Sequence, residues 1–444
     1  MTFDSHMNRE IIHLAYPVIV GMISHTVLNL VDTAMVGRLG DVALGAVGLG
    51  SFFVMVTVLI FGSLGVGTQA ITARRLGENR TEEFVRIAFN AFLLSCIVGI
   101  VVSLAGYGSS TWIFHRLSDR PEIVEKGIPY LRIRFLGIFS LIIIFTLRGY
   151  AFGMARVRID MIVSLIVNLL NIVLNYFLIF GHWIFPRLEV SGAALASVIS
   201  TVVGLVIYLL SIRYRIIERL PHDDHGYRLS RELVGRIARI SAPRAIQSFS
   251  ILGFIVFLSL IGKIGVGELA ISNIIFKAFN FSFMIGLAIG AASATLVGRS
   301  LGQGNGELAA RYGWHSVGLG TLGMGCIGIL FMLFPRQIMG VFTHVPDTIE
   351  KGVLPFRLLG AFQFIDGAGI VLSRTLQGAG STLYVMISEM VAVWCVLIPF
   401  SYITVMVMHG GIVLAWWALF LYIIVFSAAM LWKFHEGGWK KIKI

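Results

Sequence analysis

Residues 11–36 read IIHLAYPVIVGMISHTVLNLVDTAMV, a long and mostly apolar run with a single carboxylate near its end. An α-helix needs only about 20 residues to cross a hydrocarbon core about 30 Å thick. The run is too long for the apolar part of a secretory signal peptide, and it contains no small-residue cleavage site. We therefore expect a membrane-spanning helix that the mature protein retains.

Eleven further runs of this kind follow. The twelve predicted spans cover about 11–36, 45–72, 84–107, 128–153, 160–181, 190–212, 238–262, 267–297, 313–334, 352–375, 383–405 and 410–432. The 444 residues are 57% hydrophobic and 13% charged, with a mean hydropathy of +0.88, whereas a soluble chain is about 45–50% apolar and about 25% charged. This composition excludes a soluble enzyme, a coiled coil, a disordered chain and a barrel of alternating polar strands. It predicts an all-α polytopic membrane protein.

The formal net charge of +12 comes from 35 Lys and Arg against 23 Asp and Glu. Most of the basic residues stand in alternate connections between the apolar runs, which is the distribution that the positive-inside rule gives for cytoplasmic connections. The charge therefore does not indicate a nucleic-acid partner. It predicts that both termini are cytoplasmic.

A polar stretch near the middle of the chain divides the spans into six plus six. It contains PHDDHGYRLSREL, whose Pro, Asp and Gly are typical of a linker. We predict an N-lobe at 1–215, a cytoplasmic linker at 216–237 and a C-lobe at 238–444. Residues recur at an offset of 225, among them Gly37 and Gly262, Gly65 and Gly290, Arg74 and Arg299, and Gly77 and Gly302. Chance matching of glycine-rich helices is the alternative; a true repeat predicts two pseudo-symmetric six-helix lobes around a central cavity.

Several motifs follow one another along the chain: Pro17 followed by DTAMVG at 32–37, GTQAITARRLGEN at 67–79, LRGYAFG at 147–153, NIVLNY at 171–176, GAALAS at 192–197, LVGRSLGQGN at 296–305 and LQGAG at 376–380. In this order they resemble the multidrug and toxic compound extrusion (MATE) family. The seventh run, ISAPRAIQSFSILGFIVF (240–257), has no glutamate. In this respect the chain is similar to the DinF-like branch of the family, which favours assignment to that branch. Asp366 in FQFID resembles the NorM-like branch instead.

The resemblance implies a secondary antiporter and not an enzyme. It implies export of amphipathic, often cationic organic compounds by alternating access, driven by influx of H⁺ in preference to Na⁺, with no other cofactor. The implied partners are small organic cations or other amphipathic drugs and the lipid bilayer, and the implied form is a monomer in a bacterial or archaeal inner (plasma) membrane. A lipid-linked oligosaccharide flippase of the same superfamily is the alternative. A membrane-embedded enzyme is disfavoured because no catalytic motif is present.

Asp32 is a carboxylate inside a predicted span, where a charge is costly and therefore indicates a function. Asn171 and Asn175 lie four residues apart on one helical face, and Ser197 lies about two turns into the sixth span. This oxygen-rich set suits Na⁺ or a proton-carrying carboxylate, although no firm metal site is predicted. By resemblance it is the N-lobe cation site, where relatives often carry aspartate in place of Asn175, so we expect only neutral neighbours around Asp32. The alternative is that the polar side chains merely bridge helices.

Five further residues stand out in or near the spans. Asp366 and Lys277 lie well below the outer ends of two spans, and they either form an ion pair or line the cavity separately. Glu389 is expected nearer the interface. His25 could be a proton relay or a helix-packing histidine, and Pro17 could be a moving bend or a static kink.

Overall fold

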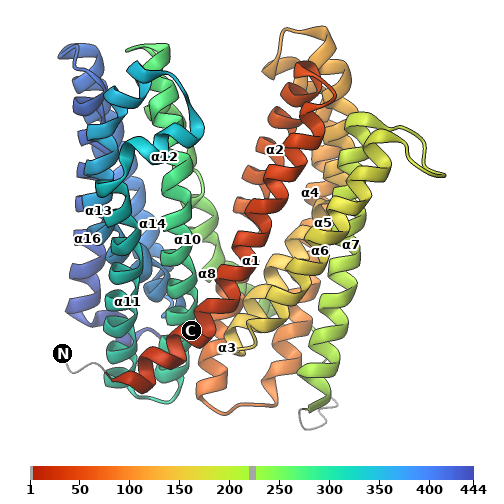
Figure 1. The fold of residues 1–444 in the computed structure, drawn as a ribbon. Helices are drawn as coiled ribbons and strands as arrows, with labels where there is room; N and C mark the ends of the chain where they lie inside the picture. The colour runs from red at the N-terminus through yellow and green to blue at the C-terminus, as the bar shows by residue number, and fades with distance from the viewer. Residues whose placement is uncertain (1–3, 220–226) are drawn as a thin grey trace. The chain divides into compact units, whose positions relative to one another are not determined.

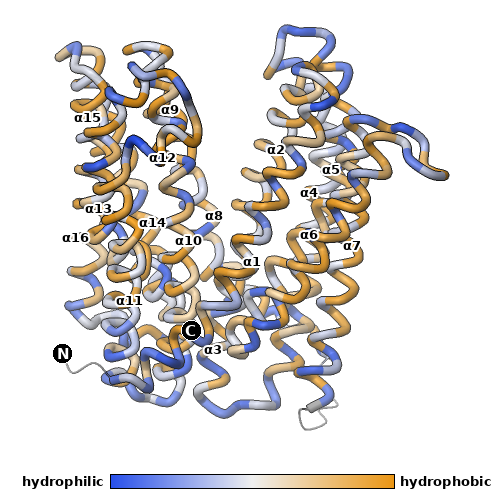
Figure 2. Tube along the Cα trace, viewed as in Figure 1, coloured by the Kyte–Doolittle hydropathy of each residue, from blue (hydrophilic) through white to orange (hydrophobic). Residues whose placement is uncertain are grey.

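The computed structural model describes residues 4–219 and 227–444, and it confirms the predicted all-α membrane fold with twelve helical spans (Figure 1). The first six spans are α1 (Ser5–Gly37), α2 (Asp41–Phe61) with α3 (Leu64–Gly77), α4 (Glu83–Leu117), α5 (Pro121–Gly153), α6 (Arg158–Phe180) and α7 (Glu189–Arg215). Hydrophobic residues run along the helices, and hydrophilic ones gather at their ends (Figure 2).

The other six spans follow the connection after α7. They are α8 (Arg231–Gln247) with α9 (Ser250–Gly262), α10 (Val266–Gly302), α11 (Gly306–Leu333), α13 (Pro346–Gly378), the segment Thr382–Val407, and α16 (Ile412–Glu436). The segment Thr382–Val407 consists of α14 (Thr382–Val391), a π-helical turn Ala392–Leu397, α15 (Ile398–Tyr402) and a second π-helical turn Ile403–Val407. Short helices are Ile217–Arg219, α12 (Pro335–Phe342) and Gly438–Lys441.

The chain forms two compact units, which we call the N-unit (Pro17–Ala245) and the C-unit (Met1–Tyr16 with Ile246–Ile444). The lobe limits drawn from the sequence, 1–215 and 238–444, stay a prediction. Part of the predicted linker, 220–226, lies outside the described residues. The residues after it join the N-unit, because the Ser230 amide donates to Asn90 Oδ1 (2.7 Å) and Asn90 Nδ2 donates to the Arg228 carbonyl (3.0 Å).

One long helix lies at the centre of each unit. In the N-unit α5 packs against α2, α3, α4 and α7, and in the C-unit α13 packs against α10, α11 and α16. The backbones of α3 and α5 approach so closely that a Cβ on Gly149 would lie 2.0 Å from the Gly65 carbonyl oxygen. Gly290, which corresponds to Gly65 in the repeat, has a similar place in the C-unit, where its Cβ would lie 2.8 Å from Arg374 Cβ. These positions therefore require glycine.

Three spans are interrupted in ways that the sequence did not predict. The second span breaks between α2 and α3 at Gly62–Ser63, and the seventh breaks between α8 and α9 at Ser248–Phe249. In the eleventh span two π-helical turns flank α15, whose second residue is Pro399. Proline lacks the amide proton of a regular helical turn, and a π-helical turn is one way in which a helix accommodates such an interruption.

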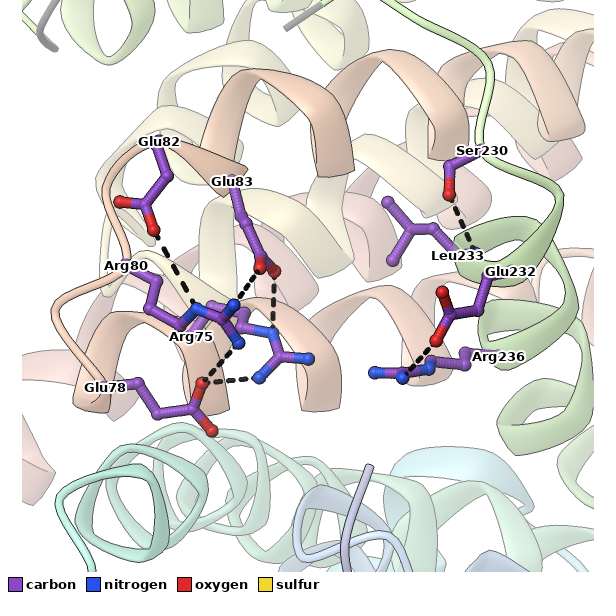
Figure 3. Close-up of polar contacts among 9 residues, drawn as sticks. All are labelled: Arg75, Glu78, Arg80, Glu82, Glu83, Ser230, Glu232, Leu233 and Arg236. Carbon is purple, nitrogen blue, oxygen red and sulfur yellow. Dashed lines mark hydrogen bonds and ion pairs between the residues drawn. The ribbon is translucent and has the colours of Figure 1, made fainter. Parts of the chain in front are cut away.

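The charged side chains near the turn that follows the second span of each repeat have different ion-pair partners in the two units. In the N-unit, Arg75 at the end of α3 pairs with Glu78 and with Glu83 (2.8 Å for Glu83) at the start of α4. Arg80, in the turn between these helices, also pairs with Glu83 (2.9 Å) (Figure 3). The corresponding positions in the C-unit carry Gln303 and Leu308 in place of Glu78 and Glu83. Ser300 and Asn305 likewise replace Arg75 and Arg80, so the charged side chains beside the turn between α10 and α11 are different ones, Arg299, Glu307 and Arg311, and they need other countercharges.

The two ends of the chain supply these countercharges. Arg311 pairs with Asp4 (3.4 Å), Arg299 pairs with Glu10 (4.0 Å), and Lys440 pairs with Glu307 (2.7 Å). The Tyr312 hydroxyl also donates to Glu10, and His315 Nδ1 lies 2.9 Å from Asn8 Oδ1. The first turns of α1 are therefore part of the C-unit, whereas the same helix continues into the N-unit from Pro17.

Candidate functional site

The structure brings Asp32 on α1 together with the two asparagines of α6. Asn175 Nδ2 donates to Asp32 Oδ1 over 2.6 Å and to Asn171 Oδ1 over 2.9 Å. Both asparagines are almost fully buried, while Asp32 is half-buried. The carboxylate can therefore be reached from one side while the amides hold it from the other.

The α7 helix adds hydroxyl groups to this network. Asn171 Nδ2 donates to Ser200 Oγ (3.2 Å) and, over a longer distance, to Ser197 Oγ (3.4 Å). In the reversed orientation of its amide, the Asn171 nitrogen would lie 3.2 Å from Asp32 Oδ1 and its oxygen would accept from Ser200 Oγ. Ser200 was missed by the sequence argument, although its spacing of three residues from Ser197 places both on one face of α7.

A cation also lies near Asp32, so the expectation of only neutral neighbours is wrong. Arg134 on α5 is within electrostatic range of Asp32, and its Nε is buried without a hydrogen-bond partner. A span sequence gives the depth of a residue but not the rotation of its helix against a neighbour, and this rotation brings Arg134 close. The site therefore combines one carboxylate with both amide and guanidinium donors nearby.

His25 lies two turns before Asp32 on α1, with an exposed side chain. It is within electrostatic range of Arg148 and Arg134, and among the described residues no hydrogen bond joins it to Asp32. Its role as a relay stays a prediction. A different contact joins α1 and α6 at this level, since Asn168 Nδ2 donates to Ser24 Oγ over 2.8 Å.

A second carboxylate of the N-unit is neutralised by a buried ion pair that the sequence argument did not consider. Asp160, at the start of α6, is 5% exposed and accepts from Arg148 Nε of α5 over 2.7 Å. Tyr208 of α7 is fully buried and within electrostatic range of both groups. The three helices are thus joined by a satisfied charge pair, which indicates a structural role.

In the C-unit the proposed pairing of Asp366 with Lys277 is not present. Asp366 is 5% exposed, whereas Lys277 is exposed, and no ion pair found among residues 4–219 and 227–444 includes either side chain. The α10 side that faces α13 is marked by Ser282, whose Oγ donates to Gln363 Oε1 over 2.6 Å. Lys277 lies five residues earlier, about 140° around the helix at 3.6 residues per turn. Lys277 and Asp366 lie at a similar depth in their spans, but their side chains do not face each other.

Asp366 has other neighbours. Glu389 on α14 and Tyr422 on α16 are both within electrostatic range of it, and Asp366 Oδ2 is buried without a hydrogen-bond partner. Glu389 accepts from Gln247 Nε2, and Gln247 Oε1 accepts from Gln377 Nε2 over 2.9 Å. The interpretation of Glu389 as a residue that simply reaches the interface is therefore corrected: it belongs to a polar network at the break between α8 and α9.

No group of three or more His, Cys, Asp or Glu side chains that could hold a metal ion is found in the described part of the chain. The groups best suited to bind a cation are the Asp32 carboxylate and the amide oxygens beside it. Asn175 Oδ1 is buried there without a hydrogen-bond partner. Carboxylate and amide oxygens are hard ligands, so this set is compatible with H⁺ and, with fewer ligands than usual, with Na⁺.

Comparisons with known proteins agree with the repeat and the fold. The MatE family model matches the chain twice, over residues 17–177 and 243–403. The probable multidrug resistance protein NorM of Thermotoga maritima is 30% identical over 98% of this chain and 94% of its own length. The multidrug resistance protein NorM of Burkholderia vietnamiensis is 30% identical over 95% of this chain and 92% of its own. A crystal structure of a MATE in the bent conformation shares the fold, with a TM-score of 0.89 at 23% identity over 99% of both chains.

Proposed function

Because the chain belongs to the MatE family, whose members are membrane transporters and not enzymes, we propose that it is a secondary active antiporter. It exports amphipathic, often cationic organic compounds by alternating access, with influx of H⁺, in preference to Na⁺, as the driving force. The name of its relatives, multidrug resistance protein, supports drug efflux. The proposal includes an inner-membrane location with both termini cytoplasmic, a monomeric form and the DinF-like branch.

The observation that carries this proposal is the Asp32–Asn175 hydrogen bond inside a membrane span. A carboxylate that accepts from an amide N–H is favoured in its ionised form, and protonation removes the charge that makes the bond strong. Proton binding therefore changes the contact between α1 and α6. A coupling ion can only shift a transporter between states when it binds those states differently, and this contact provides such a difference.

The donor geometry supports H⁺ over Na⁺. An amide nitrogen, not an oxygen, faces the Asp32 carboxylate, and a second carboxylate is lacking at Asn175. A proton needs only the carboxylate oxygen itself, so it is the ion that this arrangement suits better.

Pro17 is the position at which α1 can bend. It lies inside the continuous helix Ser5–Gly37, at the residue where that helix passes from the C-unit into the N-unit. Proline removes one backbone hydrogen bond and lowers the cost of a bend. We propose that neutralised Asp32 allows α1 to bend near Pro17, with His25 as a candidate relay and Asp366 as a second candidate coupling group.

The test is Asp32→Asn in proteoliposomes with an imposed ΔpH or ΔNa⁺. This substitution mimics the protonated form, so coupled efflux of an amphipathic cation should fall at least about tenfold while expression and folding stay intact. Asp41→Asn, an exposed aspartate at the start of α2, is the matched control and should transport like the wild type. Efflux against a gradient by Asp32→Asn, driven by either ion, would overturn the mechanism.

A drug-susceptibility assay separates the antiporter from the flippase alternative. Expression in an efflux-deficient bacterial host should raise the minimal inhibitory concentration of several unrelated cationic drugs. A flippase for lipid-linked oligosaccharides should change none of them.

A further inference from the structure

A polar stripe runs along one face of α10 in the C-unit. Asn273, Lys277 and Asn280 are spaced by four and three residues, which places them on the same side of the helix, and all three side chains are exposed. Phe281, one turn after Lys277, is 50% exposed on the same face. The stripe therefore combines a cation, two amides and an aromatic ring inside a candidate membrane span.

The Lys277 ammonium has no ion-pair partner among the residues that the structure describes. The helix that packs along α10 is α13, and two hydrogen bonds mark the contact, Ser282 with Gln363 (2.6 Å) and Ser293 with Thr375 (2.7 Å). Lys277 lies on the other side of α10 from these serines. Its charge is therefore not used in the packing of α10 against α13.

The two amides leave acceptors on the same face. Asn273 Nδ2 donates to the Leu269 carbonyl over 2.9 Å, and Asn280 Nδ2 donates to the Phe276 carbonyl over 2.9 Å. Each amide nitrogen is thus bonded within the helix, which leaves the amide oxygens beside the ammonium for an external donor. The face offers a cationic centre flanked by acceptors.

A lysine in this position is costly unless it meets water or a ligand, because a charged side chain facing lipid within a span costs several kcal/mol. The fold itself does not require it. At the repeat offset, the corresponding residues of α2 are Gly48, Phe52 and Met55, which are uncharged and apolar. The polar stripe is therefore present in the C-unit and not at the corresponding positions of the N-unit. Because the repeated fold forms without it, the stripe indicates a binding function.

We propose that this stripe is a substrate-binding face on which Lys277 binds the carboxylate of a zwitterionic amphipathic substrate. The carboxylate accepts from the ammonium, the cationic part of the substrate faces the two amide oxygens, and the apolar part lies on Phe281. The inference rests on the proposed transport function and narrows its substrate class. A compound whose carboxylate is esterified loses the charge-assisted hydrogen bond.

The test compares rhodamine B, which carries a free carboxylate, with its ethyl ester, which keeps the cationic dye and loses the anion. Binding to the purified full-length protein is measured by fluorescence anisotropy, and transport is measured in proteoliposomes under ΔpH. The wild type should bind rhodamine B about tenfold more tightly than the ester, the size expected for one charged hydrogen bond. Lys277→Met should abolish this preference with little change for the ester, and Lys277→Arg should retain it.

Lys263→Met, at an exposed lysine outside the stripe, is the matched control and should keep the wild-type preference. If Lys277→Met is folded and still prefers the free acid as the wild type does, the inference is wrong. It is also wrong if the wild type transports the ester but shows no preference for rhodamine B, a result that leaves the proposed transport function intact. Failure of the wild type to transport either dye overturns the transport proposal and, with it, this inference.

Discussion

The two repeats treat their intramembrane carboxylates in opposite ways. In the N-unit, Asp160 is buried and paired with Arg148, while Asp32 stays half-buried with an amide donor. In the C-unit, Asp366 is buried, has an unbonded oxygen, and lies within electrostatic range of Glu389. A shared helical scaffold therefore carries one satisfied charge pair and one accessible carboxylate in one unit, and a crowded acidic network in the other. The difference indicates that the two units have specialised for different tasks.

Removing the cation of the N-unit pair should have the largest effect on stability. Arg148→Met leaves the Asp160 carboxylate buried without its partner, which costs about 3–5 kcal/mol. The apparent melting temperature of the purified protein in detergent should therefore fall well below that of the wild type. Arg156→Met, at an exposed arginine in the turn between α5 and α6, is the control. Equal melting temperatures for the two variants would show that the Arg148–Asp160 pair does not stabilise the N-unit.

An intermediate effect is expected from the glutamine at the helix break of the C-unit. Gln247→Leu removes the donor to Glu389 and the acceptor for Gln377, and a buried group left unsatisfied costs about 1–3 kcal/mol. The melting temperature should fall, by less than for Arg148→Met. Gln247→Glu, which keeps an acceptor for Gln377 but places a second acid beside Glu389, should be at least as destabilising. A stable Gln247→Glu variant would contradict the assignment of Gln247 Nε2 as the donor.

The smallest effect, with the opposite sign, is expected at the acidic network itself. Asp366→Asn replaces a buried carboxyl group that has no cationic partner and lies near another carboxylate. The free energy of unfolding should therefore stay equal or rise by about 1 kcal/mol. The same measurement of the melting temperature checks this. A marked loss of stability would mean that the Asp366 charge is compensated, and the contrast between the two units would then not hold.

The sequence predicted the fold well because the length and hydropathy of each apolar run depend only on local composition, and because the repeat can be read from residues that recur at a constant offset. It also predicted which side chains share a depth, so Asp32, Asn171 and Asn175 were placed together correctly. It could not give the rotation of one helix against another. For this reason Arg134 was missed beside Asp32, and an ion pair between Lys277 and Asp366 stayed one of two alternatives, although Lys277 lies on another side of α10.

Breaks inside a span were equally invisible in the sequence. The interruption between α8 and α9 falls in an apolar run with no glycine at the break, and it places Gln247 beside Glu389. Only the packed structure shows why this position carries an amide. A glutamine inside a predicted span gives no such signal.

The division of α1 between the two units has a consequence for biogenesis. Residues 4–16 are synthesised before the N-unit, yet Arg299, Arg311 and Tyr312, which bind them, are made some 300 residues later. The N-terminal segment of the C-unit is thus synthesised before the entire N-unit, and it can bind its partners only after the N-unit has been synthesised. A nascent chain that stops after the sixth span holds an unmatched acidic end, and a separately expressed C-terminal half lacks the piece that neutralises its arginines. Split expression therefore yields interdependent fragments, and an N-terminal deletion up to Tyr16 acts on the half of the protein farthest from it in sequence.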